Sequence, residues 1–365
     1  MSFQSYVNPG IEQIAPYQPG KPVETLEREL GIKNSVKLAS NENPLGPSKR
    51  VIEALPAQLG ELARYPDGGC FLLKEALSHR FQVDPRAITV GNGSNDVLEI
   101  LARIFLRPGL NAVVSQHAFV VYGLVTLAQG AEVREIPANN YGQDLEATLA
   151  QIDSNTRLVF IANPNNPTGT WVKRSTLETF LDAVPSSVIV VLDEAYFEYV
   201  DDPEYPDGLT LMQRYSNLVV TRTFSKAYGL AGLRLGWSAT PLEIADLMNR
   251  IRQPFNVNAL AMAAGLVALE DQAHVQAGIE TNRMGLRQVR AGVEAMGLSA
   301  IPSVGNFLSV EFQQDAGSIY EAMLREGVIL RPVGVYGLPR HLRISIGTQA
   351  ENERCLQALN RVLNA

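Results

Sequence analysis

One lysine stands in a segment whose composition favours covalent chemistry. The segment TRTFSKAYGLAGLRLGW (221–237) leaves an apolar strand and enters a glycine-rich loop that holds Lys226, preceded by Thr223 and Ser225 and followed by Arg234. A lysine forms a Schiff base only when its amine is unprotonated, and burial near the charge of Arg234 would lower its pKa. The hydroxyls and the guanidinium could bind phosphate oxygens. Most lysines are solvated surface residues, but these apolar surroundings favour an imine and a phosphate together.

An acidic residue ends a second apolar run. In VIVVLDEAYFEY (188–199), Asp193 follows five apolar residues, at the point where an α/β sheet opens its ligand crevice. An ionised carboxylate there would keep a pyridinium nitrogen protonated. Tyr196 could hydrogen-bond the phenolic oxygen of the same cofactor. The alternative is that Asp193 caps a helix and Tyr196 packs in the core.

Two turn segments could complete this crevice. NPNNPTGT (163–170) follows the strand RLVFIA and is dense in turn-forming residues, and Asn166 within it would project an amide into the crevice. GNGSNDVLEI (91–100) joins a strand to a helix, so its backbone N–H groups would attract an anion. A dinucleotide is disfavoured because Asp96 replaces the third glycine of that fingerprint. A single phosphate fits better.

Two residues of SQHAFVVYG, at the end of the next strand, lie near the same crevice. Phe119 could stack on a cofactor ring, although an aromatic residue at such a point is more often part of the core. His117 could be taken for a general base, but a structural imidazole is the simpler interpretation.

The composition and charge of the chain limit the classes of molecule that it can bind. The 365 residues carry a formal charge of −7 without any lysine and arginine run, which argues against nucleic acid. No apolar run is long enough to span a membrane, and no secretory signal is visible, so we expect a cytoplasmic protein. Cys70 and Cys355 lack the spacing of a metal site. We expect no metal and assign neither cysteine a role.

The elements that must position these residues form an α/β pattern. Short apolar or β-branched runs alternate with helical patterns from about residue 86 to 240, and their spacing suits βαβ crossovers. The sequence therefore predicts a mostly parallel sheet in a large domain over residues 41–255. Helical segments followed by three more strands predict a smaller α+β domain over 256–365. The proline-rich residues 1–40 are expected to form an arm that packs with the small domain. The runs predicted as strands of the large sheet are 87–90, 112–115, 132–136, 157–162, 188–193, 218–223 and 235–240.

The motifs NPNNPTGT, VLDEAYFEY and TFSKAYGLAGLRLGW, in this order and separation, resemble those of class I/II aminotransferases of pyridoxal-phosphate (PLP) fold type I. ASNENPLGPS (39–48), RYPDG (64–68) and HLRISIGT (341–348) narrow the resemblance to the histidinol-phosphate aminotransferases, over nearly the whole chain. The resemblance implies a seven-stranded central sheet, PLP bound to Lys226 as a Schiff base, and a homodimer.

The resemblance also implies a role for each site residue. Lys226 carries the cofactor and moves the proton, Asp193 holds the pyridinium nitrogen, and Asn166 and Tyr196 bind the phenolic oxygen. Tyr65 reaches the cofactor phosphate of the neighbouring subunit. Many relatives have tyrosine at the ring-stacking position, where this chain has Phe119, so a hydrogen bond made there is lost. The residues implied to hold the phosphate within the subunit are Gly93, Ser94, Asn95, Thr223, Ser225 and Arg234.

The implied reaction transfers an amino group from histidinol phosphate to 2-oxoglutarate, in L-histidine biosynthesis. By resemblance Arg343 anchors the acidic substrate, and Arg331 and Tyr17 complete the substrate-phosphate pocket. Arg331 could equally be a surface residue of a strand. The main alternative is an aromatic amino-acid aminotransferase acting on phenylalanine or tyrosine, and a more distant one is a PLP-dependent phosphoamino-acid decarboxylase.

Overall fold

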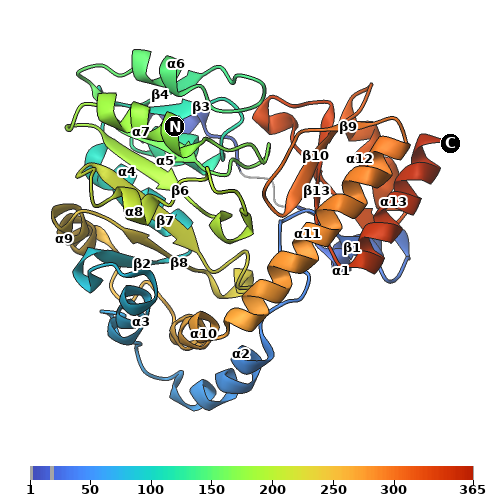
Figure 1. The fold of residues 1–365 in the computed structure, drawn as a ribbon, viewed down its shortest axis with the longest axis horizontal. Coiled ribbons are helices and arrows are strands. Elements are labelled where there is room, and N and C mark those ends of the chain that lie inside the picture. The colour runs from blue at the N-terminus through green and yellow to red at the C-terminus, as the bar shows by residue number, and fades with distance from the viewer. Residues whose placement is uncertain (1–2, 17–19, 365) are drawn as a thin grey trace.

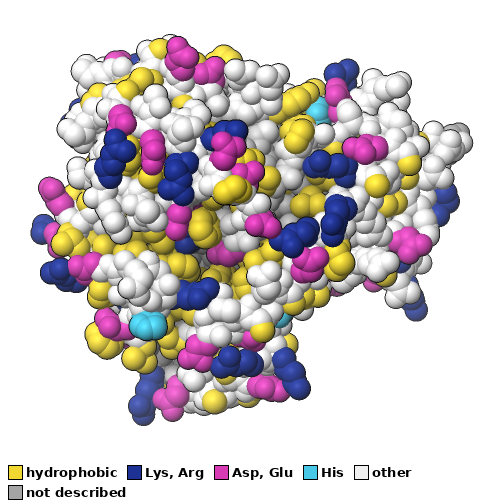
Figure 2. All heavy atoms as spheres, viewed as in Figure 1, with side chains coloured by type: hydrophobic (Ala, Val, Ile, Leu, Met, Phe, Trp, Pro, Cys, Tyr) yellow, Lys and Arg dark blue, Asp and Glu magenta, His cyan; other side chains and the backbone are white. Residues whose placement is uncertain are grey.

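The computed structural model describes residues 3–16 and 20–364. Figure 1 shows a large body built around a twisted sheet and a smaller body beside it, with the long helix α11 (Gln272–Ala295) running between them. Figure 2 shows basic and acidic side chains interspersed over the visible face rather than gathered by sign. Among the described residues, no helix combines the length and apolar character needed to cross a membrane.

The large sheet confirms the predicted α/β architecture. Its seven strands lie in the order β2-β8-β7-β6-β5-β3-β4, and each corresponds to one of the seven predicted runs. Neighbouring strands pair in parallel except on both sides of β8, which runs antiparallel to β2 and β7. The sheet is therefore mostly parallel, as expected. The strands are β2 (Ile88–Asn92), β3 (Asn111–Ser115), β4 (Glu132–Ile136), β5 (Thr156–Ala162), β6 (Ile189–Asp193), β7 (Leu218–Thr223) and β8 (Leu235–Ala239).

Helices cover both faces of this sheet, because successive residues of its central strands face two separate cores. In β6, Val190 and Leu192 join one core while Ile189 and Val191 join the other. This explains why the central runs are apolar without alternation. One face is covered by α4 (Ser94–Phe105), α5 (Val121–Ala128) and α9 (Leu242–Ile251). The other is covered by α3 (Phe71–Phe81), α6 (Leu145–Ala150), α7 (Arg174–Ala183), α8 (Gly208–Leu211) and α10 (Ala259–Glu270).

The small body has its own sheet and core. Four strands lie in the order β12-β13-β10-β9, all antiparallel, and helices α11, α12 and α13 pack against them. A two-stranded parallel pair joins β1 to β11. The elements are β9 (Ser299–Ala300), β10 (Phe307–Glu311), α12 (Ala316–Arg325), β11 (Val328–Ile329), β12 (Arg331–Pro332), β13 (His341–Ser345) and α13 (Gln349–Leu363), together with α1 (Val23–Leu30) and β1 (Val36–Lys37) from the N-terminal segment.

The N-terminal segment touches both bodies. Helix α1 and strand β1 pack on the small body, where Leu26 contacts Leu324 and Ile329. Residues 11–13 lie instead against α5 of the large body, at the point where Gly10 closely approaches Leu127. Within the described part of the predicted arm, α1 and β1 thus pack on the small body and residues 10–13 on the large one.

Helix α10 lies later in the chain than the expected end of the large domain, yet it packs with that domain. It contacts α2 (Lys49–Ala54) and α3, and Ala261 and Ala264 belong to the core of the large sheet. By packing, the division between the two bodies falls at the start of α11 rather than after residue 255. The helical pattern of 259–270 is visible in the sequence, but it does not say which core receives the helix.

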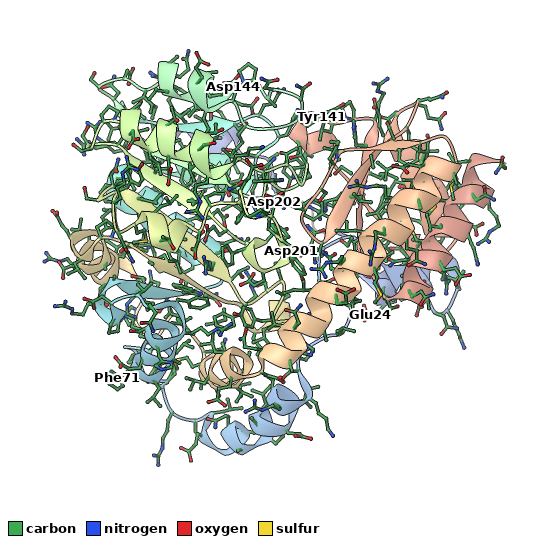
Figure 3. All side chains as sticks on the ribbon, in the orientation of Figure 1. Glu24, Phe71, Tyr141, Asp144, Asp201 and Asp202 are labelled. Carbon is green, nitrogen blue, oxygen red and sulfur yellow. The ribbon has the colours of Figure 1, made fainter. Side chains whose placement is uncertain are left out.

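Contacts between the bodies come from loops of the large one. Figure 3 places Tyr141, Asp201 and Asp202 on the side of the large body that faces the small body. The Asp201 carboxylate lies 2.7 Å from the Arg283 guanidinium of α11. The ring of Tyr141 meets the His341 ring of β13 edge to face, with 5.7 Å between centroids.

One glycine allows strand β8 to support the turn before α4. A methyl group at Gly236 would overlap the backbone nitrogen of Ser94 and lie 2.6 Å from the carbonyl carbon of Gly93. We expect Gly236→Ala to lower the free energy of unfolding by about 2 kcal/mol or more, because backbone cannot move aside as a side chain can. Urea denaturation followed by circular dichroism measures this. Gly232→Ala is the control, since its methyl group meets no atom within 4 Å, and an equal loss in both variants would contradict the expectation.

Candidate active site

A cavity opens at the carboxyl ends of β5, β6 and β7, and both bodies contribute to its wall. Parallel strands present their polar ends at this edge of a sheet. The cavity is lined by Gly20, Ala39, Ser40, Asn41, Ser94, Asn95, Phe119, Tyr122, Ala162, Pro164, Asn166, Asp193, Ala195, Tyr196, Thr223, Ser225, Lys226, Arg234, Arg331, Tyr336 and Arg343.

Lys226 lies in the loop that follows β7, and its ammonium group donates to the carbonyl oxygen of Ser40 at 3.0 Å. Burial lowers the pKa of Lys226 to about 7, and the positive charges of Arg343 and Arg234 act in the same direction, against Glu42. The expected cause, burial beside Arg234, is therefore present, with Arg343 as the stronger of the two cations. An amine with this pKa is substantially unprotonated at neutral pH.

Asp193, the last residue of β6, is only 5% exposed. The Tyr122 hydroxyl donates to one carboxylate oxygen at 2.8 Å, and the Thr221 hydroxyl donates to the other at 3.0 Å. Burial raises the pKa of Asp193, while these hydrogen bonds and the charge of Lys226 oppose the rise. A cationic partner in the cavity would hold this carboxylate ionised.

Asn166 and Tyr196 both line the cavity, and each side chain has a hydrogen-bond partner. The Arg343 guanidinium donates to the Asn166 side-chain oxygen at 2.5 Å and to the Ala39 carbonyl oxygen at 2.6 Å. The Tyr196 hydroxyl accepts a hydrogen bond from the Asn41 side-chain amide at 2.9 Å. Burial raises the pKa of Tyr196 to about 12, so its hydroxyl keeps its proton at neutral pH.

The turn before α4 forms an anion cradle with the loop after β7. Gly93 caps the helix with φ 82°, and a methyl group there would lie 2.5 Å from the Arg234 guanidinium. Arg234 also donates to the Ser225 hydroxyl at 3.4 Å. A helix N-terminus, hydroxyls and a guanidinium together suit a phosphate group.

The structure brings most of the expected residues into one cavity. Gly93 immediately precedes Ser94 in the chain, and Arg331 and Arg343, the arginines predicted to bind substrate, come from β12 and β13 of the small body. Tyr65 lies elsewhere, 82% exposed and stacked on Phe255 with 4.7 Å between ring centroids. Tyr17 lies outside the described residues.

Several wall residues were not anticipated from the sequence, among them Asn41, Tyr122, Tyr336 and Ser40, whose carbonyl oxygen accepts from Lys226. Tyr122 lies three residues after Phe119, at the start of α5, and its place in the segment SQHAFVVYG is a signal that could have revealed it. The ring nitrogen Nδ1 of His117 contacts the carbonyl oxygen of Tyr336 at 2.5 Å. This contact agrees with the structural interpretation of that histidine.

Comparison with known proteins identifies the family. The family described as aminotransferase class I and II matches residues 33–359. Histidinol-phosphate aminotransferase 2 of Pseudomonas aeruginosa is 55% identical over 363 residues, which cover 99% of this chain and 98% of that protein. Histidinol-phosphate aminotransferase 1 of Nitrosococcus oceani is 51% identical over 361 residues, with 99% and 98% covered. The crystal structure of histidinol-phosphate aminotransferase from Sinorhizobium meliloti in complex with pyridoxal-5'-phosphate superposes with a TM-score of 0.90 at 29% identity, covering 99% of this chain and 98% of that one.

The chain therefore belongs to the class I and II aminotransferases and is an enzyme of that family. Within it, histidinol-phosphate aminotransferases are relatives that share about half of its residues over the full length. The expected family, fold type and class of enzyme are confirmed.

The lowered pKa of Lys226 predicts how stability depends on pH in the cofactor-free protein. Between about pH 7 and 10.5 the unfolded chain binds a proton at this lysine that the folded chain does not. The free energy of unfolding should therefore rise with pH across this window, and Lys226→Met should flatten that rise. Urea denaturation at several pH values measures it. Lys49→Met, at an exposed position of α2, should leave the pH dependence as in the wild type, and an unchanged slope in Lys226→Met would refute the assignment.

Proposed function

We propose that this chain is a PLP-dependent aminotransferase that moves the amino group of histidinol phosphate to 2-oxoglutarate, yielding imidazole acetol phosphate and glutamate in L-histidine biosynthesis. One observation carries the proposal: a lysine with a pKa of about 7 lies in the same cavity as the buried Asp193 and two arginines. The names and full-length similarity of the relatives support the choice of substrate. We propose the cytoplasm as its compartment, supported by Cys70 and Cys355, which are buried and not disulfide-bonded.

The residues present fit the proposed cofactor. The cradle of Ser94, Asn95 and Arg234 suits its phosphate, and the buried Asp193 carboxylate suits its ring nitrogen. Asn166 and Tyr196 would bind the phenolic oxygen. The side chain of Phe119 lines the same cavity and would pack against the ring. The remaining phosphate ligands would be Gly93, Thr223 and Ser225.

When bound, PLP supplies an electron sink that weakens bonds at the substrate α-carbon. The unprotonated amine of Lys226 would accept the proton released from that carbon and carry it within the cavity. Asp193, which accepts hydrogen bonds from Tyr122 and Thr221, would hold the ring nitrogen of the cofactor in its protonated form. Arg331, Tyr336 and Arg343 of the small body form part of the cavity wall and limit the access of water to the site.

Two arginines of the small body suit the two anions that this reaction must bind. Arg343 and Arg331 lie opposite each other in paired strands, and both line the cavity. A planar guanidinium binds a carboxylate or a phosphate through the same fork, so one pocket serves histidinol phosphate and 2-oxoglutarate in turn. We assign the substrate phosphate to Arg331, with Tyr17, and the 2-oxoglutarate carboxylate to Arg343. An aromatic amino-acid aminotransferase is the alternative, since Arg343 could hold an α-carboxylate instead.

We expect histidinol phosphate to exceed phenylalanine and tyrosine as amino donor by at least about a hundredfold in kcat/KM. Arg331→Gln should lower kcat/KM for histidinol phosphate by roughly 10- to 100-fold and change that for 2-oxoglutarate far less, because a charge-assisted contact to phosphate contributes about 1.5–3 kcal/mol. Steady-state kinetics with 2-oxoglutarate measures both, with Lys226→Ala as the inactive blank. If the aromatic amino acids match histidinol phosphate, the alternative holds.

We further propose that the enzyme is a homodimer. Apolar side chains gather in an exposed group near Tyr65, a position where a partner subunit would cover them. Figure 3 places Phe71, the first residue of α3, at the outer edge of the large body. Patches of this kind mark interaction surfaces. The group consists of Leu59, Leu62, Tyr65, Phe71, Leu72 and Phe255, each between 44% and 82% exposed.

A mixing experiment tests whether Tyr65 serves the neighbouring site. Lys226→Ala and Tyr65→Ala chains should each be impaired alone. Unfolded together and refolded, they should regain about a quarter of the wild-type sites, because half of the dimers are hybrids and each hybrid has one intact site. Activity and sedimentation of the mixture measure this. Activity no higher than that of Tyr65→Ala alone would overturn the assignment across the subunits.

A further inference from the structure

Asn41 is a buried wall residue to which the proposed chemistry assigns no role. It is 1% exposed, and its backbone adopts φ 54°. Asparagine and aspartate tolerate this left-handed conformation better than other side chains with a Cβ atom. Its side-chain amide nitrogen lies 2.9 Å from the Tyr196 hydroxyl oxygen, and both residues line the cavity.

The orientation of the Asn41 side chain is held by strand β13. The Ser345 hydroxyl donates to the Asn41 side-chain oxygen at 2.8 Å, and the Asn41 backbone N–H donates to the Ser345 hydroxyl oxygen at 2.8 Å. The Asn306 side chain donates to the Asn41 carbonyl oxygen at 2.9 Å. With its oxygen facing Ser345, the amide presents its nitrogen to Tyr196.

This orientation decides what the Tyr196 hydroxyl can do. An amide nitrogen donates hydrogen bonds and does not accept them, so the Tyr196 oxygen is the acceptor. The single hydroxyl proton of Tyr196 must then point elsewhere. At neutral pH the proton is present, because burial raises the pKa of Tyr196 to about 12.

We propose that Asn41 is a positioning residue that turns the Tyr196 hydroxyl proton into the cavity, toward the phenolic oxygen of the cofactor. The inference rests on the proposed function. A proton donated to that oxygen withdraws electron density from it and weakens its hold on the proton of the neighbouring imine nitrogen. Asn41 therefore lowers the apparent pKa at which the visible absorption of the Lys226-bound cofactor changes.

Asn41→Asp tests the inference with little change of shape. Aspartate tolerates the same backbone conformation but only accepts hydrogen bonds when ionised. The Tyr196 proton would then turn to the new carboxylate and away from the cofactor. In the holoenzyme without substrate, absorption between 350 and 450 nm titrated over about pH 5–10 should show the apparent pKa raised by about one unit.

A control must separate the loss of the donor from the added negative charge, which also raises this pKa. In a Tyr196→Phe background there is no hydroxyl to turn, so the part of the shift that acts through Tyr196 disappears. Asn43→Asp is the matched control, because Asn43 is also buried but donates to the Ala227 carbonyl and not to Tyr196. The shift in apparent pKa caused by Asn43→Asp should be equal in the wild-type and Tyr196→Phe backgrounds.

A second variant keeps the inference testable if Asn41→Asp does not fold. Ser345→Ala removes the donor that orients the amide, so a smaller upward shift is expected, again dependent on Tyr196. Equal shifts in the wild-type and Tyr196→Phe backgrounds, or no shift in either variant, would overturn the role of Asn41. Failure of the proposed function would give a different result. Wild-type protein given PLP would then show no visible absorption band that depends on Lys226, as judged by comparison with Lys226→Ala.

Discussion

A carboxylate buried at the end of a parallel strand is the constraint on which the site depends. The Asp193 carboxylate is almost completely buried, and burying a charged group costs free energy unless the group is paired and hydrogen-bonded. Tyr122 from α5 and Thr221 from β7 supply the hydrogen bonds. The helix and the strand must therefore flank β6 closely, and the sheet order β7-β6-β5 is also what delivers Lys226 and Asn166 to the same edge.

Arg343 is the second fixed point, because it joins three separate parts of the chain. Its guanidinium contacts Asn166 of the large body and the carbonyl of Ala39 in the N-terminal segment, while its own strand belongs to the small body. The same charge lowers the pKa of Lys226. A single side chain thus couples the relative placement of the two bodies to the protonation of the reactive amine.

Much of the fold could be predicted from the sequence because its signals are local. Apolar runs revealed the seven strands, and turn residues after them revealed the loops of Asn166 and Gly93. Contacts that depend on three-dimensional packing could not be foreseen. Tyr122 reaches Asp193 only because α5 lies across the end of β6, and α10 gives no sign in its sequence of the core it joins. Asn41 stood within a recognised motif, yet its partner Ser345 lies 304 residues away.

This long separation has a consequence for how the enzyme is made. The cavity takes its wall from residues 39–41, from the middle of the chain and from Arg343, and Ser345 holds Asn41 in place. Contacts between distant residues form late in folding, since the intervening chain must first be ordered. A chain still emerging from the ribosome has no complete pocket. A ligand that binds only the complete pocket stabilises only molecules in which all three parts of the chain have assembled, so a chain truncated before Arg343 gains no stability from that ligand.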